Sequence, residues 1–70
     1  MREVEITVEP VELYKILKFE GLVSSGGEAK SVIDEGKALV NGQVETRKRK
    51  KIVSDDVIEF ANEKFHIRLK

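Results

Sequence analysis

Polar and apolar side chains alternate through residues 3–8, so that Val4, Ile6 and Val8 fall on one face. A period of two residues is typical of a β-strand with one buried face. The alternation stops before Pro10, a residue favoured at the start of a helix because its missing N–H would have no partner in the first turn. We therefore predict a strand followed closely by a helix.

The period becomes helical over residues 11–19. Leu13, Ile16 and Leu17 stand at i, i+3 and i+4, which places them on one apolar face. Gly21 follows, and glycine readily adopts the left-handed conformation that ends many helices. The segment is predicted to be an amphipathic helix that ends before Gly21.

A second helix is predicted between Ser25 and Gly36, after a loop of about five residues. Ser25 and Glu28 have the spacing of a capping box, in which the serine hydroxyl accepts a hydrogen bond from the backbone N–H of Glu28 and the glutamate reaches back. The expected buried stripe consists of Ala29, Val32 and Ile33.

After Gly36 the pattern returns to strands. Residues 38–40 and 43–45 flank Asn41-Gly42, a dipeptide that suits the positive φ angles of a two-residue hairpin turn. The sequence therefore predicts a β-hairpin here.

The C-terminal third contains short apolar segments separated by polar turns. Residues 52–53 are apolar, 54–56 form a turn, 57–60 a strand and 61–64 another turn, and apolar positions alternate over 65–69. We expect the last segment to pair back as an edge strand. The predicted fold class is α+β: two helices and a small, mostly antiparallel sheet that the N-terminal strand could join.

Composition limits the protein to one small domain, residues 1–70, with a marginal core. Without cysteine it can form no disulfide and no thiolate metal site. Apolar runs are far shorter than the roughly 20 residues of a membrane helix. Since the N-terminus also lacks the apolar region of a signal peptide, we expect a cytoplasmic protein.

The charge is balanced overall, with 13 basic and 13 acidic side chains, but it is unevenly distributed. Residues 1–35 hold four basic and eight acidic side chains, a net charge of −4, whereas residues 36–70 hold nine and five, a net charge of +4. Five consecutive cations, Arg47 to Lys51, follow the hairpin. Phosphates would relieve their mutual repulsion and release counterions. A solvated basic loop and a nuclear-import signal are the alternatives from charge alone.

The helix pair and the hairpin match a known pattern over about residues 12–60. The matching residues are Gly21-Leu22-Val23, Ser25, Glu28-Ala29-Lys30, Val32-Ile33, Glu35-Gly36-Lys37, Leu39-Val40-Asn41-Gly42, Val44 and the later Asp56-Val57-Ile58-Glu59. Together they resemble the S-four domain, the RNA-binding module named after protein four of the small ribosomal subunit. The short chain and residues 44–49 resemble its small bacterial YbcJ-like subgroup.

The resemblance implies a two-helix αL RNA-binding motif packed on a small, mostly antiparallel β-sheet. It also implies binding of structured RNA, such as ribosomal or transfer RNA. The chain departs from the family pattern at two positions. Many members begin the first helix with Arg-Leu-Asp, where this chain has Glu12-Leu13-Tyr14, and many carry arginine where it has Gly26. The resemblance therefore implies that two of the family's usual phosphate contacts are absent here.

The candidate RNA-binding surface joins the basic run to Lys30 and Lys37, at the second helix and its end. Each lysine also has a plainer interpretation, Lys30 as a solvated side chain and Lys37 as a favourable charge at a helix C-terminus. The full candidate set is Ser25, Gly26, Lys30, Lys37, Asn41, Thr46, Arg47, Lys48, Arg49, Lys50 and Lys51.

Several uncharged residues likewise have two interpretations. The loop at Ser25 and Gly26 could offer backbone N–H groups to a phosphate or simply form a capped turn. Asn41 could reach a base or serve only its turn, and Thr46 could bind phosphate or suit a strand. Tyr14 could stack on an unpaired base or cover the edge of the core.

We expect no catalysis, no cofactor and no metal site. His66 is the only histidine, points outward from the last predicted strand and has no cysteine to join it as a ligand. Asp55-Asp56 fits a turn better than a pair of catalytic carboxylates. A domain this small also offers little room for a small-molecule substrate.

The sequence thus predicts a monomeric, non-catalytic RNA-binding protein without membrane contact. The alternative is a small protein-interaction adaptor whose basic run binds an acidic protein partner.

Overall fold

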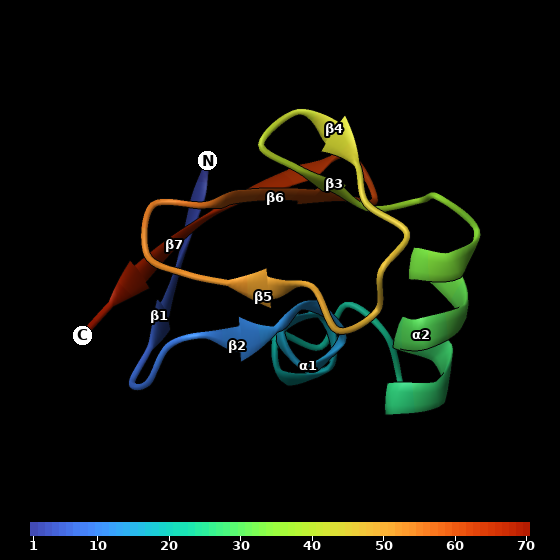
Figure 1. The fold of residues 1–70 in the computed structure, drawn as a ribbon, viewed down its shortest axis with the longest axis horizontal. Coiled ribbons are helices and arrows are strands. Elements are labelled where there is room, and N and C mark those ends of the chain that lie inside the picture. Colours follow the sequence, from blue (N-terminus) through green and yellow to red (C-terminus); the bar gives the residue numbers. More distant parts are fainter.

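The computed structural model describes all residues, 1–70. Two helices and seven strands follow one another in an order that confirms the α+β class (Figure 1). The elements are β1 (Arg2–Ile6), β2 (Val11–Glu12), α1 (Leu13–Phe19), α2 (Gly26–Asp34), β3 (Leu39–Val40), β4 (Gln43–Val44), β5 (Lys51–Ile52), β6 (Val57–Phe60) and β7 (Glu63–Leu69).

Five strands form one sheet in the order β1-β7-β6-β3-β4, and β2 pairs with β5 in a separate two-stranded ribbon. Every pairing is antiparallel except that of β1 with β7, in which Arg2 lies opposite Phe65 and Ile6 opposite Leu69. The N-terminal strand therefore joins the sheet, as the sequence allowed. The ribbon brings the start of α1 beside the end of the segment that follows β4.

Two expectations about these strands were wrong. β7 is not an edge strand, because β1 covers its outer side and leaves β1 itself at the edge. The first strand also ends at Ile6, so that Val8 lies beyond it and is 65% exposed. The chain bends after Ile6 to reach β2, which carries Val8 out of the buried face.

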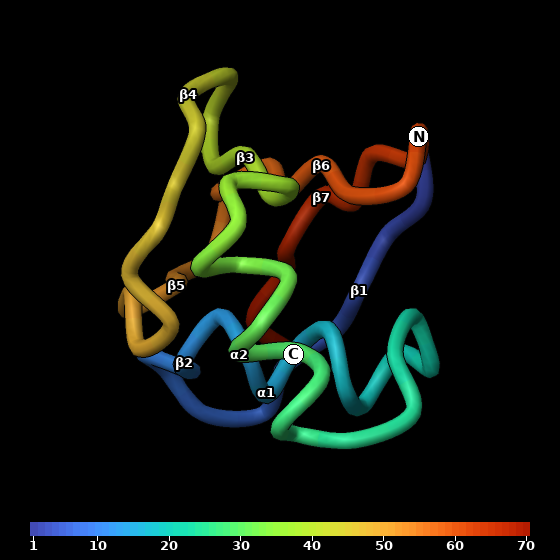
Figure 2. Tube along the Cα trace, turned by 90° about the vertical axis from the view of Figure 1, so that its right-hand side faces the viewer, coloured from blue at the N-terminus to red at the C-terminus, as the bar shows by residue number.

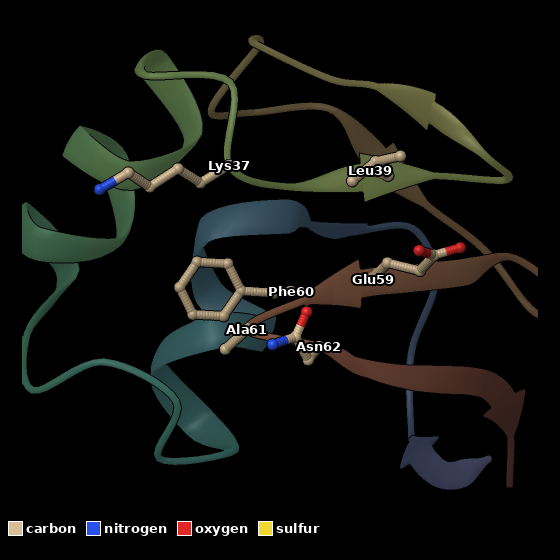
Figure 3. A pocket seen from close by; sticks show the side chains of 6 residues that line it. All are labelled: Lys37, Leu39, Glu59, Phe60, Ala61 and Asn62. Carbon is tan, nitrogen blue, oxygen red and sulfur yellow. The ribbon is translucent and has the colours of Figure 1, made fainter.

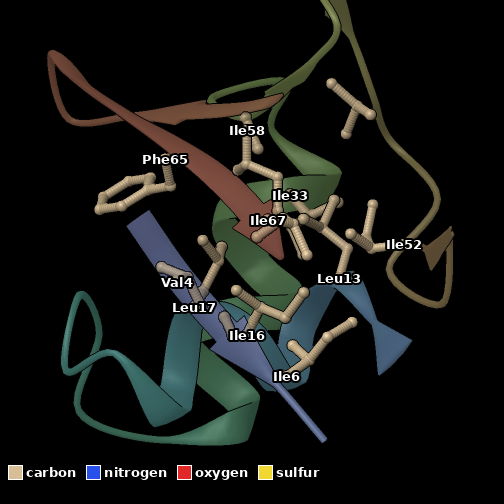
Figure 4. Packing of buried hydrophobic residues seen from close by; sticks show 13 residues of the cluster. Val4, Ile6, Leu13, Ile16, Leu17, Ile33, Ile52, Ile58, Phe65 and Ile67 are labelled. Carbon is tan, nitrogen blue, oxygen red and sulfur yellow. The ribbon is translucent and has the colours of Figure 1, made fainter. Parts of the chain in front are cut away.

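The core is a single cluster of 13 buried hydrophobic side chains, and no polar side chain is buried. The sheet, both helices and β5 all contribute to it (Figure 4). The predicted stripe of α1 is fully confirmed, since Leu13, Ile16 and Leu17 are buried. In α2, Ala29 and Ile33 are buried, whereas Val32 is only partly buried and packs at the margin of the cluster.

Both helices end as predicted, at glycines with positive φ: Gly21 at 71° and Gly36 at 78°. At the start of α2 the Ser25 hydroxyl accepts the Glu28 N–H at 3.1 Å, which confirms the predicted cap. The Glu28 carboxylate instead accepts hydrogen bonds from the N–H and the hydroxyl of Ser24, one residue earlier than the capping-box pattern. These two bonds lower the pKa of Glu28.

The predicted β3–β4 hairpin is confirmed, with Asn41 at φ 52° and Gly42 at φ 83°. Ala61 and Asn62 also have positive φ angles and form a second two-residue turn. This turn is shorter than predicted, because Glu63 and Lys64 already belong to β7.

Candidate nucleic-acid interface

The run of cations lies in the segment that connects β4 to β5, here called the basic loop (residues 45–51). Arg47 to Lys50 form no strand; the chain turns at Lys48 and Arg49, and the Lys50 N–H bonds to the Arg47 carbonyl at 3.1 Å. Only Lys51 is in a strand, the first residue of β5. Figure 2 shows this yellow segment running down the side of the molecule away from β1 to reach β5 and β2. The side chains therefore do not alternate between two faces, as they would on a strand.

The backbone of the basic loop caps the N-terminus of α1. The Leu13 N–H donates to the Lys50 carbonyl at 2.9 Å, and the Tyr14 N–H donates to the Lys48 carbonyl at 3.1 Å. The N-cap residue, Glu12, supplies no side-chain hydrogen bond of its own. Since the first N–H groups of a helix lack partners inside the helix, these carbonyls satisfy them. The backbone of the loop is thereby fixed beside α1, and its cationic side chains start from fixed positions there.

Arg47 is held by a neighbouring carboxylate. Its Nε and Nη2 donate to the two oxygens of Glu45 at 2.9 and 3.1 Å, and its backbone N–H donates to the same carboxylate at 2.9 Å. The side-chain hydrogen bond from Arg47 is the strongest of the effects that lower the pKa of Glu45 to about 2, although partial burial opposes them. The same bond raises the pKa of Arg47. In the free protein the charge of Arg47 is therefore largely compensated.

Arg49 is held more loosely, by Glu12. Its Nη1 lies 3.4 Å from one Glu12 oxygen, and the Lys15 Nζ lies 3.4 Å from the other. Partial burial raises the pKa of Glu12, but hydrogen bonds from Lys15 and Arg49 and their charges outweigh it, so the pKa is lowered overall. Glu12 thus anchors a cation of the loop.

The remaining cations of this region make no ion pair. In the basic loop they are Lys48, Lys50 and Lys51, and on the helices they are Lys18 and Lys30. Lysines rather than arginines therefore present uncompensated charge. An ammonium group acts as a point charge on phosphate, without the bidentate geometry of a guanidinium.

Tyr14 lies where α1, α2 and the basic loop meet. The Lys30 Nζ is 4.7 Å from its ring centre, the Arg49 Cζ 5.7 Å and the Lys15 Nζ 6.0 Å. Gly26 is close by, since a Cβ there would lie 3.9 Å from Tyr14 Cε2 and from Lys18 Cδ. The structure therefore places Lys30 and Gly26 near the loop and adds Tyr14, Lys15 and Lys18 of α1. The i, i+4 spacing of Tyr14 and Lys18 is a local signal, whereas the approach of Lys30 and Arg49 to the same ring is not.

Lys37 stands apart from this group. Its Nζ pairs with Glu35 at 3.0 Å, and its side chain borders a hollow with Leu39, Phe60 and Asn62 (Figure 3). A different hollow, beside the β3–β4 hairpin, is bordered by Arg47, Lys50 and Lys51 of the basic loop. No ion pair or hydrogen bond joins Lys37 to the loop.

The three uncharged polar candidates differ in how far the fold already engages them. The Asn41 amide donates to Asp56 at 3.0 Å and accepts the Val57 N–H at 2.9 Å, so both of its ends are in use. The Ser25 hydroxyl caps α2, as described above. Thr46 is exposed, and its hydroxyl has no hydrogen bond within the protein.

His66 lies on the other side of β7 from the buried Phe65 and Ile67. Its ring sits between two carboxylates, with Nδ1 3.4 Å from Glu3 and Nε2 3.3 Å from Asp55. No group of three or more histidine, aspartate or glutamate side chains is arranged to hold a metal ion. None of the helices is both long and apolar enough to cross a membrane.

Comparisons with known proteins agree on one family. A model of the S4 domain, the S-four domain of the sequence analysis, matches residues 4–68. A relative from Escherichia coli (strain K12), named "Putative RNA-binding protein YbcJ", is 53% identical over 51 residues, which is 73% of either chain. Another from Bacillus subtilis (strain 168), named "Probable ribosome maturation protein RlbA", is 34% identical over 56 residues, 80% of this chain and 79% of the relative.

The fold is also similar to a solved one. The solution structure of YbcJ from E. coli, described as revealing an αL motif involved in RNA binding, superposes with a TM-score of 0.73 and 42% identity. The match covers 97% of this chain and 87% of the other.

Proposed function

The chain belongs to the S4 domain family, and from that premise we propose that it is a non-catalytic protein that binds structured RNA of the ribosomal or transfer RNA type. The observation that carries the proposal is the anchoring of the basic loop. Two of its carbonyls cap α1, which fixes five consecutive cations beside the helix pair. Cations gathered on an anchored backbone suit a polyanion of defined shape.

The chemistry of the surface favours the phosphate backbone of folded RNA over unpaired bases. Lys48, Lys50 and Lys51 present free ammonium groups, which recognise phosphates with little dependence on sequence. Stacking of single-stranded bases needs exposed aromatic rings, and the ring that lies among these cations, that of Tyr14, is half-buried and already approached by three of them. Double-helical RNA is read mainly by shape and by backbone contacts, which this surface can make.

The relatives support the same class of partner. YbcJ is described as RNA-binding, and RlbA carries ribosome maturation in its name. We place the protein in the cytoplasm, where ribosomal and transfer RNA act, and propose that it binds as a monomer.

Fluorescence anisotropy with a labelled RNA hairpin and a DNA duplex of matched length, each at several salt concentrations, tests the proposal. Wild type is compared with the triple variant Lys48→Gln, Lys50→Gln, Lys51→Gln, which keeps the loop carbonyls that cap α1. The matched control is Lys64→Gln, Arg68→Gln, Lys70→Gln, which removes the same charge from exposed positions in and after β7.

We expect tighter binding to RNA than to DNA. The log–log salt slope should become shallower by about 0.9 for each phosphate that the loop variant no longer neutralises. The control variant should bind RNA as wild type does. Equal, weak binding to both nucleic acids that vanishes at physiological salt would contradict the proposal. Capture of an acidic protein that survives nuclease treatment would then favour the adaptor alternative.

A further inference from the structure

Tyr14 is approached by cations from three separate elements of the fold. Lys15 comes from α1, Lys30 from α2 and Arg49 from the basic loop, and all three lie 4.7 to 6.0 Å from one ring centre. The face of an aromatic ring attracts a cation at this range. The only other such pair in the protein is that of Arg2 with Phe65.

The three cations repel one another and need a compensating partner. Glu12 provides one for Lys15 and for Arg49, at 3.4 Å each. Lys30 has no ion pair, and its closest favourable partner is the Tyr14 ring at 4.7 Å. The ring therefore holds Lys30 on the side of α2 that faces the basic loop.

The backbone of Tyr14 is fixed in place, and its ring is half-buried. Tyr14 is half-buried in the first turn of α1, packs against the core, and donates its N–H to the Lys48 carbonyl at 3.1 Å. Gly26 lies next to it and carries no side chain that could fill the space. Tyr14 thus carries its ring from a fixed backbone position into the place where the three cations gather.

We propose that Tyr14 is a positioning residue of the RNA-binding surface, whose ring holds Lys30 of α2 and Arg49 of the basic loop together so that both act on the same phosphate group. This inference rests on the proposed function and names the phosphodiester of folded RNA as the ligand of this subsite.

Two substitutions distinguish the effect of the aromatic ring from that of an apolar side chain in general. Tyr14→Phe keeps an aromatic face, whereas Tyr14→Leu keeps an apolar side chain without one. For each variant we would measure RNA affinity over a range of salt concentrations and, without RNA, the melting temperature. Upfield ring-current shifts of the Lys30 side-chain protons report the proximity of Lys30 to the Tyr14 ring in the free protein, independently of any RNA.

We expect Tyr14→Leu to bind RNA about fivefold to tenfold more weakly, the effect of removing one or two cation–π interactions, with a shallower salt slope. Tyr14→Phe should stay within about twofold of wild type and keep the Lys30 shifts. Lys30→Gln should weaken RNA binding clearly in the wild-type and Tyr14→Phe backgrounds. In the Tyr14→Leu background it should weaken binding much less, because the Lys30 ammonium group has already lost its position there.

Equal affinities of the Phe and Leu variants would overturn the inference. So would an additive effect of Lys30→Gln and Tyr14→Leu, which is the result expected if a base stacks on the ring independently of the lysine. If Tyr14→Leu fails to fold, two other measurements still test the inference: the ring-current shifts of Lys30 in wild type, and the effect of Lys30→Gln on RNA affinity in the Tyr14→Phe background. Absence of the shifts together with an unchanged affinity would contradict the inference. If wild type does not bind RNA at all, it is the proposed function that fails.

Discussion

The side chains of Asn41 and Asp56 join two turns that lie 15 residues apart in the sequence. The Asn41 amide donates to one Asp56 oxygen at 3.0 Å, and the other Asp56 oxygen accepts the Val53 N–H at 3.0 Å. Asn41 also accepts the Val57 N–H at 2.9 Å. The tip of the β3–β4 hairpin is thereby tied to the turn that precedes β6.

Breaking this tie should loosen the hairpin. Asn41→Gly keeps a residue suited to φ 52° but removes the amide, and Asp56→Ala removes the carboxylate. We expect each to lower the free energy of unfolding by about 0.5–1.5 kcal/mol, the net contribution of a typical hydrogen bond, because the freed groups can bond to water at this exposed site. Urea denaturation should show that the double variant costs less than the two single variants added together. Strict additivity would mean that the two side chains act independently. Gln43→Ala, in exposed β4, serves as the control and should change stability by less than about 0.5 kcal/mol.

Removing the carboxylate that holds Arg47 should strengthen RNA binding. Glu45→Gln releases a guanidinium that is otherwise compensated by a bidentate ion pair. We expect tighter binding and a salt slope steeper by about 0.9, the contribution of one further neutralised phosphate. Anisotropy titrations over salt measure both quantities, with Glu59→Gln, whose partner is Lys64, as the control. A slope identical to that of wild type would show that Arg47 does not reach the RNA.

The same pair should make stability depend on pH in the acid range. The pKa of Glu45 is about 2 in the folded protein and 4.5 ordinarily, so the folded state holds the ionised form more strongly. Its contribution is complete above pH 4.5 and is lost as the pH falls toward about 2. Urea denaturation at neutral pH and at several values below 4.5 should show wild type and Glu45→Gln converging in acid. A constant difference in unfolding free energy across this range would contradict the assignment. The pKa values of Glu12 and Glu28 are also lowered, so wild type and Glu45→Gln should both lose further stability in acid.

Alanine substitution should change the stability in opposite directions at two glycines, Gly27 within α2 and Gly36 just after it. Gly36 has φ +78°, and an added Cβ would lie 3.5 Å from Val44 Cγ1, so Gly36→Ala should cost about 1–2 kcal/mol through left-handed backbone strain. Gly27 is within the helix, and an added Cβ would meet only the Ser25 hydroxyl at 3.9 Å. Gly27→Ala should therefore gain about 0.5–1 kcal/mol of helix propensity. Thermal denaturation of both variants checks the contrast, and a stabilising Gly36→Ala would refute it.

The features predicted correctly from the sequence are those with a local signal. The i, i+3, i+4 spacing of Leu13, Ile16 and Leu17 is enough to identify the buried face of α1, and Asn41-Gly42 is enough to identify its turn. The place of β7 in the sheet has no such signal. It depends on pairing with β1 from the opposite end of the chain, and an alternating strand looks the same whether it has one neighbour or two.

The candidate site divides in the same way. A run of five cations is visible in the sequence, but which of them are compensated depends on where carboxylates lie in space. Glu12 reaches Arg49 across 37 residues of sequence, and no spacing rule connects them. The meeting of Tyr14, Lys30 and Arg49 likewise depends on how α1 and α2 pack against the basic loop, which a linear pattern does not contain.

The capping of α1 by the Lys48 and Lys50 carbonyls bears on how this surface can evolve. A carbonyl group is common to all twenty residue types, so the loop supports the helix through atoms that substitution does not remove. Its side chains are then free to diverge as the bound RNA changes, at little cost to folding. Mutational drift can thus retune recognition in this small domain while its architecture is inherited unchanged.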